Sequence, residues 1–320
     1  MSIAIVTPSY GPDRELFRAL HASVLEHTDD DVVHHVIVPS RDVAAFRSIS
    51  SSRLDVVDSS SLLPAGYVDV YPLTRRLQGR SPAALRTLAK IQAVHPARPW
   101  APLRGWILQQ VAKIAFAGRL DADVVLLVDS DVVICRHLDA SAFLSDGRSV
   151  LYRRDDAIDD HMVLHVEWCR TADRLLGRSG TVRPPVPDYI AGFVPWDPAR
   201  VRAMQRQVSA VTGRHWIDAV VRERHFSECI LYGRYLDTVS DDRASMLHTS
   251  DTRCLSHWDP RPLSSDEAEL FLSGLRPTDL AVQIQSTSDT DPGVRAALVK
   301  EAARRLGSDD QVSRRPGGGD

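Results

Sequence analysis

The sequence predicts an α/β protein with a doubly wound, mostly parallel sheet and helices on both of its faces. Two observations predict this class. Short runs rich in Val and Ile alternate with helical patterns through residues 3–57, and Pro, Gly and Ser separate them. Farther along, a helical pattern leads into the most apolar strand of the chain, residues 122–128. Strands that alternate with helices pair in parallel, so a ligand site is expected at their carboxyl ends.

The elements of the first half follow in order. An apolar run at residues 3–7 predicts a strand, and the break at residues 8–12 precedes an amphipathic helix from Asp13 to about Glu26. The same criteria predict a strand at 32–38, a short helix to Arg47 and a strand at 54–57. Residues 59–103 are rich in Ser, Pro and Arg and predict an irregular insertion over the sheet, with a helix near 82–93.

The second half contains further alternation. A helix is predicted at 103–120, before the apolar strand. The elements predicted after that strand are a helix at 138–144, a strand at 149–153, a charged loop at 154–161, a helix at 162–176, a Gly/Pro loop at 177–187, a strand at 189–196, helices at 198–212 and 215–234, a strand at 280–285 and a helix at 292–306. The Gly-rich residues 307–320 predict a disordered tail.

Composition excludes several classes of protein. The net charge of −3 and the pI near 6.5 provide no general attraction for phosphate backbones, so we expect no nucleic-acid partner. The four cysteines are far apart and form no CxxC pair, which argues against a zinc site, an iron–sulfur site or a disulfide scaffold. No basic segment precedes the short apolar run at the N-terminus, and no apolar stretch is long enough to span a bilayer. We therefore expect a cytoplasmic protein without an integral membrane segment.

The strand at 122–128 ends in two carboxylates, Asp129 and Asp131, with Ser130 as a small spacer. Carboxylates one residue apart at a sheet edge form a hard oxygen site, where Mn²⁺ or Mg²⁺ can bridge the protein and a phosphate-bearing ligand. The alternative is that one Asp caps a helix and the other is solvated. The run of apolar residues directly before Asp129, at 124–128, favours the metal site.

A second polar group lies on the preceding helix. Its residues Trp106, Gln109, Gln110 and Lys113 share one face, opposite an apolar stripe. Lys occurs only at positions 90, 113 and 300, whereas the other 36 of the 39 basic residues are Arg, so the compact charge of Lys113 departs from the habit of the chain. This face suits a ligand, although an exposed polar face would look the same.

Five segments together resemble the GT-A class of nucleotide-sugar glycosyltransferases and, within it, a bacterial branch known mainly as a domain of unknown function (DUF6492-like). They are the opening Ile-Val-Thr-Pro-Ser-Tyr, the Gly-Trp…Gln-Gln…Lys helix, Leu-Leu-Val-Asp-Ser-Asp, Phe-Ser-Glu followed by Leu-Tyr-Gly, and Ser-His-Trp. The resemblance covers about residues 1–290. It implies a nucleotide-diphospho-sugar transferase fold in one GT-A-like domain, with a nucleotide-binding half at 1–135, a sugar and acceptor half at 136–290 and a C-terminal helix at 291–306.

The resemblance also implies a set of site residues. Asp129 and Asp131 form the DxD motif that holds Mn²⁺ or Mg²⁺ on a nucleotide diphosphate, and a late histidine completes the metal shell. His257 is the candidate and His248 its competitor. The loop from Thr7 to Tyr10 cradles the nucleoside. The donor site as a whole comprises Thr7, Pro8, Tyr10, Trp106, Gln110, Lys113, Asp129 and Ser130.

For the chemical step the resemblance points to Glu228, where inverting members of the class place a general base. Ser227 is the predicted N-cap of a helix that begins there, and a first-turn Glu also stabilises a helix without any catalytic role. Asp188 is the next candidate. It precedes a segment, Tyr189 to Trp196, that resembles the strand lining the donor sugar and the acceptor.

The predicted function is a metal-dependent, hexosyltransferase-type glycosyltransferase that moves a sugar from a nucleotide diphosphate donor, a UDP-sugar, to a hydroxyl acceptor. The alternative is a haloacid-dehalogenase-like phosphohydrolase with Asp129 as nucleophile, which needs a second acidic pair after a later strand. Residues 239–242 contain such a pair. A third possibility is a nucleotide-binding protein without turnover, which would keep the DxD motif and not need Glu228.

Overall fold

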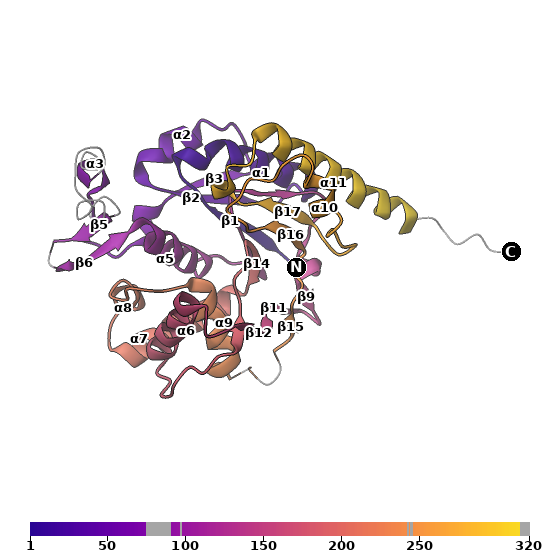
Figure 1. Cartoon of the computed structure of the whole chain (residues 1–320). Coiled ribbons are helices and arrows are strands. Elements are labelled where there is room, and N and C mark those ends of the chain that lie inside the picture. The colour runs from indigo at the N-terminus through magenta and orange to yellow at the C-terminus, as the bar shows by residue number, and fades with distance from the viewer. Residues whose placement is uncertain (75–90, 97, 242, 244–245, 314–320) are drawn as a thin grey trace.

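The computed structural model describes residues 1–74, 91–96, 98–241, 243 and 246–313 (Figure 1). A five-stranded central sheet has the order β14-β7-β1-β2-β3. Its first four strands in the chain run parallel, and β14 pairs antiparallel with β7. The strands are β1 (Ile3–Pro8), β2 (His34–Val38), β3 (Leu54–Asp58), β7 (Val124–Val128) and β14 (Phe193–Trp196).

Alternating residues of β1 pack against helices on opposite faces of the sheet. Ile5 lies in a buried cluster with Leu20 and Val24 of α1 (Arg14–His27). Its neighbour Val6 lies in another cluster with Val111 of α5 (Gly105–Ala117). Successive side chains of a strand point to opposite faces, so one continuous strand requires cover on both sides. The predicted class, a mostly parallel sheet with helices on both faces, is confirmed.

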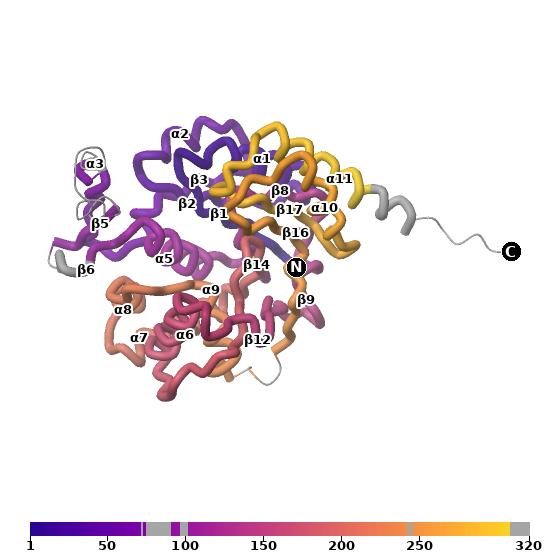
Figure 2. The backbone as a smooth tube through the Cα atoms, viewed as in Figure 1, coloured from indigo at the N-terminus to yellow at the C-terminus, as the bar shows by residue number. Residues whose placement is uncertain are grey.

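Two three-stranded sheets extend the molecule. The strand order β16-β17-β8 joins β8 (Val132–Ile134) to β16 (Cys254–His257) and β17 (Ala281–Ile284). The chain thus returns from its far end beside the carboxyl edge of β7 (Figure 2). Helices α10 (Ala268–Leu272) and α11 (Pro292–Ser313) pack near it. The other sheet has the order β4-β5-β6, with bounds Val68–Asp69, Ile91–His95 and Arg98–Arg104.

A group of helices lies on the other side of the central sheet in Figure 1: α6 (Val163–Leu176), α7 (Pro198–Thr212), α8 (Trp216–Val220) and α9 (Glu228–Thr238). A buried ion pair fixes α9 on α6, because Arg234 donates to both carboxylate oxygens of Asp173 at 2.8 and 2.7 Å. The remaining short elements are α2 (Val43–Arg47), α3 (Tyr71–Thr74), β9 (Leu144–Ser145), β10 (Arg148–Ser149), β11 (Leu151–Tyr152), β12 (Arg154–Ile158), β13 (Val186–Asp188) and β15 (His248–Thr249).

Three predictions for the first half need correction. The insertion at 59–103 is not irregular in its described residues, because they contain the sheet β4-β5-β6. The helix expected near 82–93 lies outside the described residues up to 90, and residues 91–93 belong to β5. The helix expected at 103–120 begins only at Gly105, because residues 98–104 pair with β5 as an antiparallel hairpin.

Five predictions for the second half also need correction. The charged loop at 154–161 contains β12, which pairs with β13 as an exposed ribbon. Instead of a helix at 138–144, the chain forms a single 3₁₀ turn (Ala140–Phe143), which Asp139 caps by accepting from the amide of Ser141. The strand expected at 149–153 is divided between β10 and β11, and the one at 189–196 begins at Phe193. The tail expected from 307 continues α11 to Ser313, and residues 314–320 lie outside the described residues.

All four cysteines are buried and free, as expected from their spacing. Within the described residues, no helix combines the length and apolarity that a membrane span requires.

Candidate active site

The end of β7 places the two carboxylates of the DxD motif at the carboxyl edge of the central sheet. The amide of Asp129 donates to the carbonyl of Gly192 at 2.9 Å, which continues the pairing of β7 with β14 by one residue. Ser130 points the other way and is buried. Its hydroxyl lies 3.1 Å from the carbonyl oxygen of Pro8 and 3.0 Å from Oγ of Ser9. Ser130 therefore ties the end of β7 to the end of β1.

Asp131 is held by two groups from the C-terminal part of the chain. Nε2 of Gln283 donates to its Oδ1 at 2.9 Å, and the amide of Ser286 donates to its Oδ2 at 2.7 Å. Burial raises the pKa of Asp131, and the nearby charge of Asp129 raises it further. Gln283 lies tightly against Gly192, where a Cβ would come within 2.5 Å of both atoms of the amide group.

The polar face of α5 reaches the same edge. The side chain of Lys113 is 14% exposed, and its Nζ lies 3.3 Å from Oδ1 of Asp129 and 3.0 Å from Oε1 of Glu228. Burial alone would lower the pKa of Lys113, but the charges of Asp129 and Glu228 outweigh it and raise the pKa, so the ammonium stays charged. The carbonyl of the Gln110 side chain accepts from the amide of Glu228 at 3.0 Å. Three separate segments of the chain thus meet at one buried ammonium.

Glu228 begins α9, as the sequence predicts, and Oγ of Ser227 caps this helix by accepting from the amide of Ile230 at 3.4 Å. The carboxylate of Glu228 is buried beside Lys113. Ser227 therefore caps the helix while the next residue, Glu228, contacts Lys113.

The first loop after β1 is divided between core and surface. Thr7 is fully buried, and its hydroxyl lies 2.9 Å from Nε2 of His34. Pro8 is buried too, whereas Tyr10 is 37% exposed. Burial, followed by the charges of Asp13 and Tyr71, raises the pKa of the Tyr10 hydroxyl, which places these groups near one another. Of the three predicted loop residues, Tyr10 is the one that offers an exposed ring.

Trp106 and Asp188, two further predicted site residues, make their contacts with other groups than Lys113. Trp106, at the start of α5, is 50% exposed, and its ring centroid lies 5.4 Å from that of Trp168. Asp188 ends β13 and is half-buried, with its Oδ1 accepting from the amide of Ile190 at 3.1 Å. Burial raises the pKa of Asp188.

The ring of His257 does not join the two aspartates. Its Nε2 lies 3.0 Å from the carbonyl oxygen of Arg261, and its ring centroid lies 6.1 Å from that of Phe271. His248 lies elsewhere, with its Nε2 3.1 Å from Oδ1 of Asp237. Throughout the described residues, no three His, Cys, Asp or Glu side chains are grouped as a metal site.

Three site residues were missed by sequence reasoning. Burial, with the charges of Asp131 and Asp129, raises the pKa of Asp13 to about 6, and the charge of Arg295 opposes this rise. Asp13 and Arg295 therefore belong to the electrostatic environment of the DxD motif. Gln283 is the third, and it had a signal, because it is the only polar residue of the otherwise apolar strand Ala281–Ile284.

A family model matches residues 2–279, and its description is "Family of unknown function (DUF6492)". The chain belongs to this family. Membership of DUF6492 confirms the predicted family. A search of curated proteins found no match for this DUF6492 chain.

Several solved structures are similar to the DUF6492 chain. One is the apo form of the bifunctional glycosyltransferase WbbM, with a TM-score of 0.44 and 11% identity over 95% of this chain and 51% of that one. The chain therefore spans about half the length of WbbM. Another is apo mouse xyloside xylosyltransferase 1, with a TM-score of 0.44 and 11% identity over 91% of this chain and 100% of that one. The galactosyltransferase LgtC with donor and acceptor sugar analogs has a TM-score of 0.43 and 13% identity, and 95% of each chain is covered.

The carboxylates of this DUF6492 chain fit a divalent cation that is shared with a ligand. Mg²⁺ and similar ions are commonly bound by one or two carboxylates plus substrate phosphates. Asp129 has a side chain that is 35% exposed, and Asp131 lies beside it. Burial raises the pKa values of Asp131 and Asp13, and the neighbouring carboxylates raise them further. Two buried amide atoms, Nε2 of Gln110 and Oε1 of Gln283, also lack hydrogen-bond partners among the described residues.

Proposed function

We propose that this protein transfers a sugar from a nucleotide diphosphate donor, a UDP-sugar, to a hydroxyl acceptor in a reaction that depends on Mn²⁺ or Mg²⁺. The observation that carries the proposal is the group at the end of β7, where Asp129 and Asp131 lie beside the buried ammonium of Lys113. Carboxylates and a cation at one strand end suit a ligand with a charged diphosphate.

The residues divide the work of binding the donor. A divalent cation at Asp129 and Asp131 would supply positive charge to the leaving diphosphate. Lys113 would add a second fixed cation on the same side, since its ammonium is already charged and needs little reorganisation. The exposed ring of Tyr10 would contact the nucleoside, and Arg41 stacks over the ring of nearby Tyr71 at 3.7 Å.

Glu228 and Asp188 are the carboxylates proposed for the chemical step. Glu228 lies 3.0 Å from the ammonium of Lys113, so it is near the donor charges. Within the described part of the chain, Asp188 forms no ion pair with Lys113. Burial raises the pKa of Asp188, so its carboxylate is a stronger proton acceptor than that of an exposed Asp. Either would accept the proton of the acceptor hydroxyl as the new glycosidic bond forms.

The phosphohydrolase alternative receives less support. Asp241, the described member of the later acidic pair, follows the end of α9 at Thr238 and not the end of a strand. Asp241 would therefore not lie at the sheet edge with Asp129. Covalent labelling of Asp129 by beryllium fluoride, an aspartyl-phosphate analogue, would nevertheless reverse this ranking.

The test measures UDP binding by calorimetry and slow hydrolysis of UDP-sugars, with and without Mn²⁺. Asp131→Ala should weaken Mn²⁺-dependent UDP binding by at least about 10- to 100-fold, because loss of a ligand should cost no less than loss of an outer partner. Asp131→Asn keeps the shape of the side chain and controls for folding. Asp160→Ala, at an exposed aspartate of the loop after β12, should bind UDP normally. Metal-independent binding that survives in folded Asp131→Ala would refute the metal assignment, and binding without hydrolysis of any UDP-sugar would favour a protein without turnover.

A further inference from the structure

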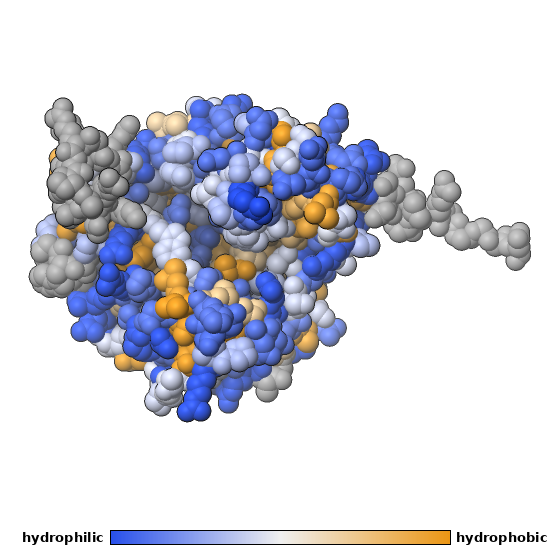
Figure 3. All heavy atoms as spheres, viewed as in Figure 1, coloured by the Kyte–Doolittle hydropathy of each residue, from blue (hydrophilic) through white to orange (hydrophobic). Residues whose placement is uncertain are grey.

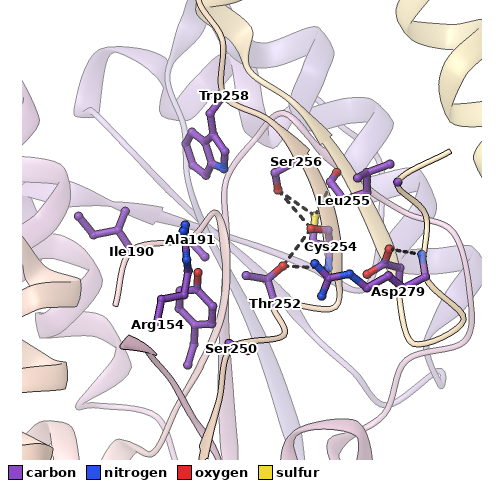
Figure 4. A pocket seen from close by; sticks show the side chains of 13 residues that line it. Arg154, Ile190, Ala191, Ser250, Thr252, Cys254, Leu255, Ser256, Trp258 and Asp279 are labelled. Carbon is purple, nitrogen blue, oxygen red and sulfur yellow. Dashed lines mark hydrogen bonds between the residues drawn. The ribbon is translucent and has the colours of Figure 1, made fainter. Parts of the chain in front are cut away.

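Figure 4 shows side chains that line a cavity of about 460 Å³. Ile190 and Ala191 form part of its wall. The next residue, Gly192, accepts a hydrogen bond from the amide of Asp129 and contacts Gln283, which in turn donates to Asp131. Ala191 of the cavity wall is thus followed directly by Gly192, which contacts residues of the proposed donor site. The volume of the cavity suits one or two sugar rings.

The walls of this cavity differ in chemistry. Figure 4 shows Trp258 and Arg154 toward one side, and Thr252 and Ser256 toward the other. Trp258 is 48% exposed, so a face of its indole is open to a ligand. An aromatic face opposite several hydroxyl groups suits a sugar, which has an apolar ring face and many hydroxyls.

The two arginines of the cavity are in different states. Arg276 is 3.5 Å from Oδ1 of Asp251 and is therefore already neutralised in part. Arg154 is exposed, and within the part of the chain that the structure describes it forms no ion pair with a carboxylate. Asp188 is its register partner on β13, so the two side chains share a face of the ribbon without reaching ion-pair distance. The guanidinium of Arg154 forms a side-chain hydrogen bond with Tyr152, which leaves its other N–H donors for a ligand.

On this basis, and resting on the proposed function, we propose that the acceptor is an anionic sugar, which carries a carboxylate or a phosphate group that Arg154 binds while the ring lies against Trp258. Both kinds of anion accept the paired donors of a guanidinium, so the shared chemistry is a sugar-borne anion. Asp188, on the same face of the ribbon, lies on the acceptor side of the site.

The test measures binding of small sugars to the protein loaded with UDP and Mn²⁺, by saturation-transfer NMR titration. Methyl glucuronide and glucose 6-phosphate are the two anionic probes, and methyl glucoside is the neutral one. At least one anionic probe should bind about 10-fold more tightly than the neutral one, because a hydrogen bond to a charged group is stronger than a neutral one. The anionic probe that binds more tightly than methyl glucoside shows whether Arg154 prefers a carboxylate or a phosphate.

Three variants assign that difference to the cavity. Arg154→Gln should abolish the preference for the anion, and Trp258→Ala should weaken all three sugars about equally. Arg206→Gln, at an exposed position of α7, should change neither. Equal binding of anionic and neutral sugars by the wild type, or a preference that survives Arg154→Gln, would overturn the proposal. Hydrolysis of UDP-sugars needs no acceptor. A wild-type protein that hydrolyses no UDP-sugar would therefore contradict the proposed function itself and not only the anionic acceptor.

Discussion

Replacing Lys113 by Met should destabilise the protein strongly, because it leaves two carboxylates facing one another without their cation. The ammonium lies 3.3 Å from Asp129 and 3.0 Å from Glu228. At an effective dielectric constant near 20, each contact is worth about 5 kcal/mol of Coulomb energy before the cost of desolvation. Removal of one partner from a buried ion pair typically costs about 3–5 kcal/mol, and this is the loss expected for Lys113→Met.

A double-mutant cycle separates the ion pair from ordinary packing. Glu228→Gln removes one negative charge and should make Lys113→Met less costly, with an interaction energy of about 1–3 kcal/mol between the two changes. The measurement is the free energy of unfolding in urea for the wild type, both single variants and the double variant at pH 7. Additive losses, within about 0.5 kcal/mol, would show that Lys113 and Glu228 do not interact energetically and would refute this reading of the site.

Three other perturbations test the same region. Glu228→Gln should leave UDP affinity within a few-fold and lower turnover by about 10²- to 10⁴-fold if Glu228 is the base, so near-normal turnover at saturating donor would remove it from the mechanism. Gly192→Ala should cost about 1–3 kcal/mol of stability, because its Cβ would come within 2.5 Å of the Gln283 amide, and Gln283→Ala should restore part of this loss in the same urea assay. Burial, with the charges of Asp131 and Asp129, raises the pKa of Asp13 to about 6, above its value near 3.9 in an unfolded chain, so the folded state holds the proton more tightly and stability falls as pH rises from about 4 to about 6. Asp13→Asn should therefore raise the thermal midpoint more at pH 7 than at pH 4, and an equal change at both values would contradict the assignment.

Strands with a buried face were the most predictable part of the fold. β1, β2 and β7 are rich in Val, Ile and Leu, and their predicted bounds differ from the observed ones by no more than two residues. The ribbon β12–β13 and the hairpin β5–β6 were missed. Strand β12 begins with three exposed charged residues, β5 has half-buried polar residues among its apolar ones, and both strands depend on a partner strand for their hydrogen bonds. No periodicity within one segment reveals such a partner.

The candidate site, too, could be predicted from the sequence only where a local pattern marks the residue. The positions of Asp129 and Lys113 could be inferred from local pattern, since one ends an apolar strand and the other interrupts the Arg usage of the chain. The contact between Lys113 and Glu228 joins residues 115 positions apart and depends on how α9 is packed on α5. Gln283 reaches Asp131 across 152 positions for the same reason. Contacts of this kind follow from tertiary packing and not from any single segment.

The hydroxyl of Ser130 has a consequence for the thermodynamics of ligand binding. It joins the ends of β7 and β1 through Pro8 and Ser9, so the metal-binding and nucleoside-binding parts of the proposed site are linked before any ligand arrives. A nucleotide that spans both parts would not have to order them relative to each other, and less conformational entropy would be lost on binding. The small residue between the two aspartates would therefore contribute to affinity through its contacts with the end of β1.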